Sequence, residues 1–456
     1  MRVRLEDIRA CLDGAIPGSI ATVAADGTPN IAYLSQVQYV DSGHVALSYQ
    51  FFSSTRRNVL ASAFARVALI HPFTAAHYRL TLEYLRTETE GPLFEGMKAK
   101  LAGIASHTGM ADVFRLLGSD VYRVLDIEQV PGHCLPAPPV RRNVVLALRR
   151  SSERLRDATD LEGLLAGALA SLADHFAIDH AMVLMADERR QALYTIASHG
   201  YESSGVGSEI PFGHGVIGVA ARELAPIRIG HFSAEYAYGR AIRENLSACG
   251  LTSGLDAEIP LPGLSDVRSQ LAVPIAVNGR LLGVLCAESA RDLAFDYDDE
   301  DALVALAALL GAMMQSLQHG ADVPDERNRR TADRDATDGT PLSVRHFDEN
   351  DSIFVGDDYL IKGVAGSIFW ALVRDYASLG RVAFSNRELR LDPRIRLPEL
   401  GDNLEARLIL LKRRLEERDC GIRIEKRGRG RIALQVERPL QLVDIPRQLP
   451  NSVKRP

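Results

Sequence analysis

Two short clusters of polar and basic residues in this sequence could do chemistry. The first, Ser53-Ser-Thr-Arg-Arg-Asn58, brings hydroxyls and guanidiniums to the start of a helix expected over 58–65. Such groups, with the free amides of a helix N-terminus, favour a phosphate. The second, Lys426-Arg-Gly-Arg-Gly-Arg431, repels itself unless an anion is near, and a nucleic-acid backbone suits it. The alternative without a ligand is a capped helix with solvated arginines for the first cluster, and a solvated hairpin edge for the second.

Length and composition indicate the number of domains and the class of protein to which these clusters belong. With 456 residues the chain is too long for one core, and about 150 residues per domain predicts three domains. The composition, 46% hydrophobic and 25% charged, is that of an ordinary globular protein. A net charge of −6 excludes a chain that is polycationic throughout. From His346 onward, however, 21 Lys and Arg face 17 Asp and Glu, a local excess of basic residues.

The sequence predicts a cytoplasmic protein that has no membrane partner. It contains no run of 18 apolar residues, and its N-terminus lacks the apolar region of a signal peptide. The 5 cysteines are dispersed without a C-x-x-C pair, which favours reduced thiols and predicts no metal site.

Two segments divide the chain. Residues 131–143 are rich in proline, and residues 320–345 are charged and poor in large apolar side chains. We expect both to be linkers, the second disordered. The predicted domains are therefore 1–130, 144–319 and 346–445, in a multidomain α+β protein.

The first domain is predicted to be a small β-barrel. Asp26-Gly27 signals a hairpin within Gly18–Ser35, and further strands are expected at 44–50, 66–71 and 81–89. The order of an ATVAADGTPN hairpin, a strand and FFSSTRRNVLASAFARVALIHP resembles the pyridoxamine 5′-phosphate oxidase-like split-barrel family.

The resemblance implies an FMN-binding split barrel whose flavin lies at a dimer interface. Its phosphate would be held by Ser54, Thr55, Arg56, Arg57 and Asn58. The Arg-x-His substrate pair of the true oxidases is missing, which argues against vitamin B6 oxidation. Relatives bind FMN, a deazaflavin or haem, and the sequence leaves these cofactors open. Two histidines are the candidates for a haem ligand: His71 and His77.

The middle domain begins with an expected amphipathic helix over Val144–Ala173, whose leucines form an apolar stripe with room for a dimer contact. A hairpin is expected around Asn278-Gly279, followed by a closing helix over 297–317. We interpret Phe295, Asp296 and Asp299 as the cap of that helix.

The segments GHGVIGVAAR, VRSQLAVPI and NGRLLGVLCAES of the middle domain resemble the GAF family. The resemblance implies an α/β sandwich that senses a small molecule and dimerises through its flanking helices. Cys249 and Cys286 are interpreted as ordinary thiols. The pocket candidates lie in the long insert between strands: Tyr236, Tyr238, Arg240, Arg243 and Cys249.

The third domain is predicted to contain helices over 364–376, from about Asn386, and over 402–417, then a hairpin over 421–436. This order resembles the winged helix-turn-helix of response-regulator effectors. The resemblance implies that one group of residues contacts DNA: Arg407, Lys412, Arg414, Lys426, Arg427, Arg429 and Arg431. A winged helix that binds protein is the alternative.

Together these patterns predict a homodimeric regulator of transcription that senses a ligand or a redox change and binds DNA. Two alternatives stay open. One is a flavin-dependent oxidoreductase regulated by its GAF domain, and the other is a signalling scaffold that does not bind DNA.

Overall fold

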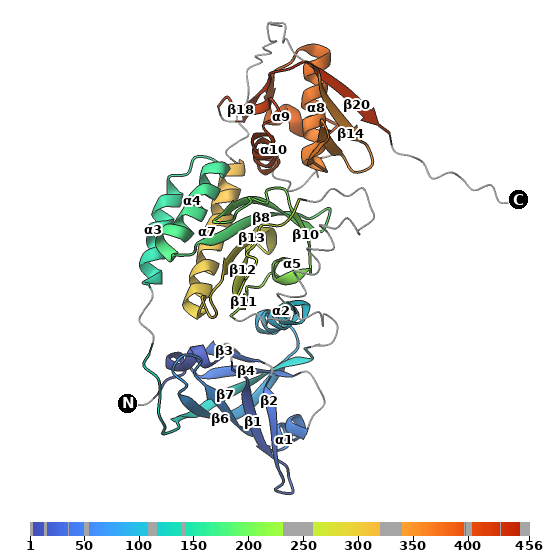
Figure 1. Ribbon diagram of the computed structural model, residues 1–456. Coiled ribbons are helices and arrows are strands. Elements are labelled where there is room, and N and C mark those ends of the chain that lie inside the picture. Colours follow the sequence, from blue (N-terminus) through green and yellow to red (C-terminus); the bar gives the residue numbers. More distant parts are fainter. Residues whose placement is uncertain are drawn as a thin grey trace, which may run out of the picture.

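The computed structural model describes residues 3–12, 16–34, 36–49, 54–107, 116–137, 142–230, 259–319, 340–395, 397, 404–428 and 430–446, without the side chains of 102–107 and 318–319. Each of three modules is built on its own sheet or sheets. We call them the N-terminal module (3–137), the middle module (142–319) and the C-terminal module (340–446). They follow one another along Figure 1 from blue to red.

The N-terminal module is a seven-stranded antiparallel sheet in the order β2-β1-β5-β6-β7-β4-β3. The hairpin expected around Asp26-Gly27 is confirmed, because β1 pairs with β2 across that turn. The elements are η1 (Glu6–Leu12), β1 (Gly18–Val23), β2 (Pro29–Leu34), β3 (Val37–Asp41), β4 (His44–Tyr49), α1 (Ser54–Ser62), β5 (Phe64–Ile70), β6 (His77–Glu88), α2 (Pro92–His107) and β7 (Gly118–Gln129).

Helix α1 starts four residues before the expected helix over 58–65, at Ser54. The residues added include two arginines, which are good helix formers. The helix ends early because Ala63 adopts φ +61°, the left-handed conformation that terminates helices. The whole hydroxyl and arginine cluster after Ser53 therefore lies within α1 instead of in front of it.

The middle module is a six-stranded sheet in the order β10-β9-β8-β13-β12-β11. Helices α3, α4 and α7 cover one face, and α5 covers the other together with α2 of the N-terminal module (Figure 1). The elements are α3 (Val144–Arg156), α4 (Leu161–Phe176), β8 (His180–Asp187), β9 (Ala192–His199), β10 (Glu209–Pro211), α5 (Gly215–Glu223), β11 (Ile227–Ile229), β12 (Ser269–Val277), β13 (Arg280–Ser289) and α7 (Tyr297–His319).

The single helix expected over Val144–Ala173 is wrong, because the structure has two helices there, α3 and α4. Asp160 starts the second one by accepting a hydrogen bond from the Gly163 amide at 2.8 Å. The two helices pack against each other and against α7. Much of the leucine stripe is thus buried within the module.

Two other local expectations for the middle module are confirmed. Asn278 and Gly279, with φ +52° and +75°, form the tight turn between β12 and β13. Asp296 and Asp299 cap α7 reciprocally, each carboxylate accepting from the other residue's amide at 3.0–3.1 Å. By length and hydropathy α7 could cross a membrane, but one side of it, with Leu303, Leu306 and Leu310, packs in the core of the middle module.

The C-terminal module combines two small sheets with three helices. One sheet has the order β16-β15-β14-β20, with β14 and β20 parallel, and the other has the order β17-β19-β18. The elements are β14 (Leu342–Phe347), β15 (Ser352–Val355), β16 (Asp358–Ile361), α8 (Val364–Leu379), β17 (Ala383–Ser385), α9 (Asn386–Leu391), α10 (Leu404–Arg418), β18 (Ile422–Lys426), β19 (Arg431–Val436) and β20 (Leu440–Ile445).

The expected helices and hairpin of this module are present, including the Ser385–Glu388 capping box at α9. The first sheet was not foreseen. Its strand β14 begins at Leu342, inside the segment 320–345 that was expected to be a linker. Residues 320–339 lie outside the described residues.

His346 of β14 ties this first sheet together. Its ring stacks on Trp370 of α8 at 4.9 Å, while Nδ1 lies 2.8 Å from Asp444 of β20 and Nε2 lies 3.2 Å from Asp351. Burial alone would lower the pKa of His346, but the hydrogen bonds to Asp351 and Asp444 outweigh it and raise that pKa.

We predict that this histidine makes the C-terminal module less stable at alkaline pH. Because the pKa is raised on folding, the stabilisation is complete below about pH 6.5, the unfolded value, and is lost as pH rises through the folded pKa. Urea denaturation followed by Trp370 fluorescence isolates this module, since the chain has 1 tryptophan. As pH rises, the difference in unfolding free energy between the wild type and His346→Gln should shrink by about 1.4 kcal/mol for each unit by which folding raises the pKa of His346. A difference independent of pH would contradict this.

Candidate functional site

In the N-terminal cluster, Arg56 is already paired. Its Nη1 donates to both carboxylate oxygens of Asp120, one of them at 2.5 Å, and its Nη2 donates to Thr87 at 3.0 Å. The guanidinium also lies 3.7 Å from the centre of the Tyr49 ring. Since Asp120 is buried and neutralises this charge, Arg56 contributes to the fold of the module and supplies little net charge for a phosphate.

The other predicted phosphate-binding residues divide into inner and outer groups. Asn58 is buried and donates to Thr22 at 3.1 Å, while Thr55 accepts from Asn30 at 2.8 Å. On the outer side, Arg57 donates to the Ser54 hydroxyl at 3.1 Å, at the first turn of α1, which contains no acidic residue. The N-terminal end of α1, with Ser54, Thr55 and Arg57, is the part of the cluster that suits an anion.

The two histidines considered for haem have other surroundings. His71 accepts hydrogen bonds through Nδ1 from the amides of Phe73 and Thr74, both at 3.2 Å, so this nitrogen supports a turn. His77 is exposed at the start of β6.

Two arginines of α10, Arg407 and Arg413, face the middle module. Arg407, only 5% exposed, donates to Asp187 of β8 at 2.8 Å, and its guanidinium lies 4.2 Å from the ring centre of Tyr194 on β9. Arg413 donates to the Ile196 carbonyl at 2.6 Å. In this arrangement Arg407 does not face an open surface, as a residue that reads DNA would.

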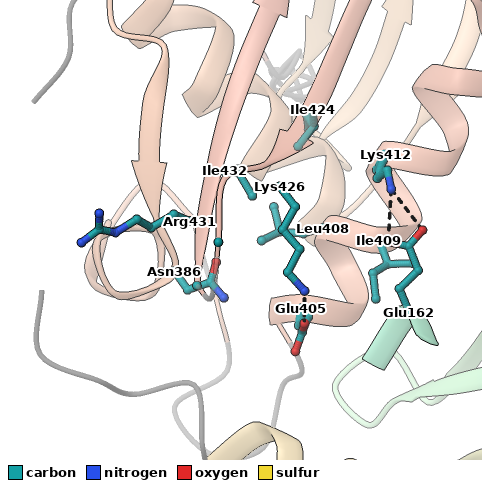
Figure 2. A pocket seen from close by; sticks show the side chains of 12 residues that line it. Glu162, Asn386, Glu405, Leu408, Ile409, Lys412, Ile424, Lys426, Arg431 and Ile432 are labelled. Carbon is teal, nitrogen blue, oxygen red and sulfur yellow. Dashed lines mark hydrogen bonds and ion pairs between the residues drawn. The ribbon is translucent and has the colours of Figure 1, made fainter. Parts of the chain in front are cut away.

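Two lysines continue this contact beside a pocket between α10, the β18–β19 hairpin and the start of α4 (Figure 2). Lys412 binds both carboxylate oxygens of Glu162 at 3.1 Å. Lys426 lies 2.7 Å from Asp160 and 3.7 Å from Glu405. The hydrogen bond from Lys426 lowers the pKa of Asp160, so this pair persists above the carboxyl's ordinary pKa and weakens in acid.

The remaining predicted DNA contacts differ in exposure. Arg414 is 5% exposed and donates to the Leu360 carbonyl at 3.1 Å and to Glu417 at 2.7 Å, so it is enclosed within the fold. Arg427 is largely exposed and pairs with Glu425 at 2.7 Å. Arg431 is exposed beside the pocket of Figure 2, and Arg429 lies outside the described residues.

The five predicted pocket residues of the middle module, Tyr236 to Cys249, also lie outside the described residues. The sheet face beneath α5 carries a buried polar group that the sequence did not single out. Glu288 of β13 accepts from Gln270 Nε2 and from the Leu264 amide, both at 3.0 Å. Beside them burial raises the pKa of the Cys286 thiol, which keeps it protonated at neutral pH. A carboxylate on a face whose other side chains are mostly apolar is suited to orient a ligand.

Comparison with known proteins matches residues 160–314 to the family model of the GAF domain. These residues form a GAF domain. The match covers the sheet, α4, α5 and most of α7, and GAF domains sense small molecules. No curated protein matches the chain.

Similar solved structures include the GAF domain of a phosphoenolpyruvate-protein phosphotransferase from Coxiella burnetii, with 21% identity and a TM-score of 0.31 over 40% of this chain and 98% of that chain. They include free methionine-R-sulfoxide reductase from Neisseria meningitidis in complex with its substrate, with 23% identity and a TM-score of 0.32 over 41% of this chain and 98% of that chain. They also include an FMN-binding protein from Syntrophomonas wolfei, with 18% identity and a TM-score of 0.25 over 28% of this chain and 86% of that chain.

The start of α7 joins the GAF domain to the N-terminal module. Glu300 binds Arg228 at 2.8 Å and Lys100 of α2 at 3.5 Å. Burial favours a higher pKa for Glu300, but the two cations outweigh it and lower that pKa. Arg9 of η1 reaches Asp301 at 3.0 Å. The acidic run that begins α7 is therefore both a helix cap and a docking surface.

Sequence reasoning missed three acidic partners in the GAF domain: Asp187 and Glu162, which pair with α10, and Asp160, which pairs with Lys426 of β18. Local patterns do not show which distant carboxylate meets which cation. A usable signal was present in α10, where Ile409 and Leu410 lie off the predicted stripe of leucines. A helix with apolar residues on two sides needs two partners, and both residues are buried.

We predict that Asp187→Ala lowers the free energy of unfolding by about 3–5 kcal/mol, because it leaves the buried charge of Arg407 without a partner. The loss should be much smaller in the double variant Asp187→Ala/Arg407→Leu. Urea denaturation measures the free energy of unfolding of the wild type and of each variant. The control is Asp174→Ala, which removes an exposed ion pair with Arg154 and should cost at most about 1 kcal/mol. Equal losses in the two single variants would contradict a specific role for Asp187.

Proposed function

We propose that the chain is a ligand-responsive transcription regulator whose GAF domain senses a small molecule and whose C-terminal module is a winged helix that binds DNA. The observation that carries the proposal is the arrangement of basic residues on α10 and the β18–β19 hairpin. Helix α10 carries Arg407, Lys412 and Arg413, and the hairpin beside it carries Lys426 and Arg431. A helix with a neighbouring basic hairpin fits a major groove and the phosphates beside it.

The contact between α10 and the GAF domain supports control of this module by a ligand. Arg407 and Arg413 touch β8 and β9, strands of the sheet whose opposite face carries Glu288 and Cys286. A ligand bound to that sheet changes the position of α10 only if it binds two states with different affinity. The GAF domain and the C-terminal module are in direct contact at α10. A ligand that binds one state more tightly can therefore change this contact.

We further propose that the N-terminal module binds FMN in a homodimer. The N-terminal end of α1, with Ser54 and Arg57, would hold the phosphate, and the bound flavin would make the protein responsive to redox state. The edge strand β2 and its surroundings expose a group of large apolar side chains, which a second copy of the chain would cover. These side chains are Val23, Ile31, Tyr33, Leu60 and Phe64.

The DNA proposal predicts that Arg427→Glu weakens binding to a fluorescently labelled duplex about tenfold or more. The same change should lower the salt dependence of binding by about one or two units of log–log slope, because phosphate contacts release counterions. Anisotropy titrations at several salt concentrations measure both quantities. Arg438→Glu, at the opposite end of the same hairpin, is the matched control. Equal affinity of the wild type and Arg427→Glu at every salt concentration would contradict a contact between this hairpin and DNA.

The flavin proposal predicts that Arg57→Ala weakens FMN binding about tenfold, since a guanidinium–phosphate hydrogen bond contributes roughly 1.5–3 kcal/mol. Riboflavin, which lacks the phosphate, should bind the wild type and Arg57→Ala equally. Quenching of flavin fluorescence measures both affinities, and Arg79→Ala on the exposed side of β6 is the control. If the wild type quenches neither flavin, the module has another role.

A further inference from the structure

We infer that the GAF domain inhibits the C-terminal module by covering with its own carboxylates the basic surface that the module would present to DNA. The inference rests on the proposed function. We call Asp160, Glu162 and Asp187 the acidic clasp, and Arg407, Lys412 and Lys426 the basic face. Each carboxylate of the clasp pairs with one cation of the basic face. The distances are 2.7 Å for Asp160–Lys426, 3.1 Å for Glu162–Lys412 and 2.8 Å for Asp187–Arg407.

The acidic clasp and the basic face are complementary in position as well as in charge. The clasp comes from the start of α4 and the end of β8, and the basic face comes from α10 and the end of β18. Elements distant in the sequence thus place three carboxylates opposite three cations. The carboxylates of the clasp thus offer α10 a set of fixed negative charges, as the phosphates of a duplex would.

The contact excludes DNA from α10. Arg407 is 5% exposed, and the apolar neighbours Ile409 and Leu410 are 6% and 3% exposed. At Gly207, a loop residue of the GAF domain, an added Cβ would lie 3.5 Å from Arg414 and 3.7 Å from Leu410, both on α10. No duplex can enter so close a contact. DNA binding by this helix and docking on the GAF domain are therefore alternatives.

The contact is also weak enough to be reversed. The Lys412–Glu162 and Lys426–Asp160 pairs are roughly a third exposed, and such pairs contribute about 0–1 kcal/mol each. The buried Arg407–Asp187 pair gains little net free energy, because desolvation opposes the attraction. A ligand that favours the open state by a few kcal/mol suffices to release α10.

The test uses the full chain and changes only the GAF side. The double variant Asp160→Asn/Glu162→Gln removes two charges of the clasp, and asparagine still caps α4. The control, Glu153→Gln/Asp174→Asn, makes the same chemical changes on α3 and α4, where both residues pair with arginines of α3. It corrects for the general gain in DNA attraction that follows the loss of two negative charges.

Two measurements are made on each protein: the affinity for a short fluorescent duplex of random sequence, and the radius of gyration by small-angle X-ray scattering. We expect the clasp variant to bind DNA about tenfold more tightly than the control, a change of about 1.4 kcal/mol, and to be more extended. Glu162→Gln alone, with the same expected direction and with the Asp160 cap of α4 kept, is a second variant in case the double variant folds poorly.

The outcomes separate the two proposals. If all proteins bind DNA measurably and with equal affinity, the inhibition is refuted while DNA binding stands. If the clasp variant extends but no protein binds DNA, both the inhibition and the proposed function fail. If the clasp variant stays compact and binds no better than the control, the carboxylates do not hold α10, and the inference is wrong.

Discussion

The arrangement of the C-terminal half depends on one buried ion pair, Arg407 with Asp187. An arginine without a partner could not lie at 5% exposure, so the position of α10 requires a carboxylate at the end of β8. Stacking on Tyr194 adds a second partner of the right kind, since an aromatic ring face attracts a cation. The apolar residues beside Arg407 then fill the remaining contact. The pair selects the register of α10 on the sheet more than it adds stability.

The GAF domain contacts both outer modules through ion pairs, and at each junction it supplies the carboxylates. At its N-terminal junction the acidic start of α7 receives cations from the N-terminal module, and Arg9 and Arg228 lie 4.6 and 4.4 Å from the ring centre of Tyr297. At its other junction α4 and β8 receive cations from α10. Helix α7 packs on α4, and α4 packs on α10, so packed helices connect the two junctions. Both outer modules can therefore influence one sensor.

Local features could be predicted from the sequence because short-range physics decides them. The Asn278-Gly279 turn, the Asp296–Asp299 cap and the Ser385–Glu388 box are all as expected. The long helix over Val144–Ala173 was wrong because the leucine spacing continues across the break between α3 and α4. The signal for the break was Asp160, which caps α4. The partner of Arg407 could not be found, since 220 residues separate it from Asp187. A basic residue off an apolar stripe is compatible with DNA and with a carboxylate alike, and only the tertiary contact distinguishes them.

The parallel pairing of β14 with β20 has a consequence for the order of folding. Leu342 opens the C-terminal module and pairs with Leu440 near its end, so all the helices of the module lie within the loop that this pairing closes. Contacts between such distant residues form late and slowly, because the entropy of the loop must be lost first. During synthesis β14 has no strand on one side until β20 has left the ribosome. Helices α8 to α10 can therefore form, and α10 can meet the GAF domain, before the sheet at the back of the module is complete.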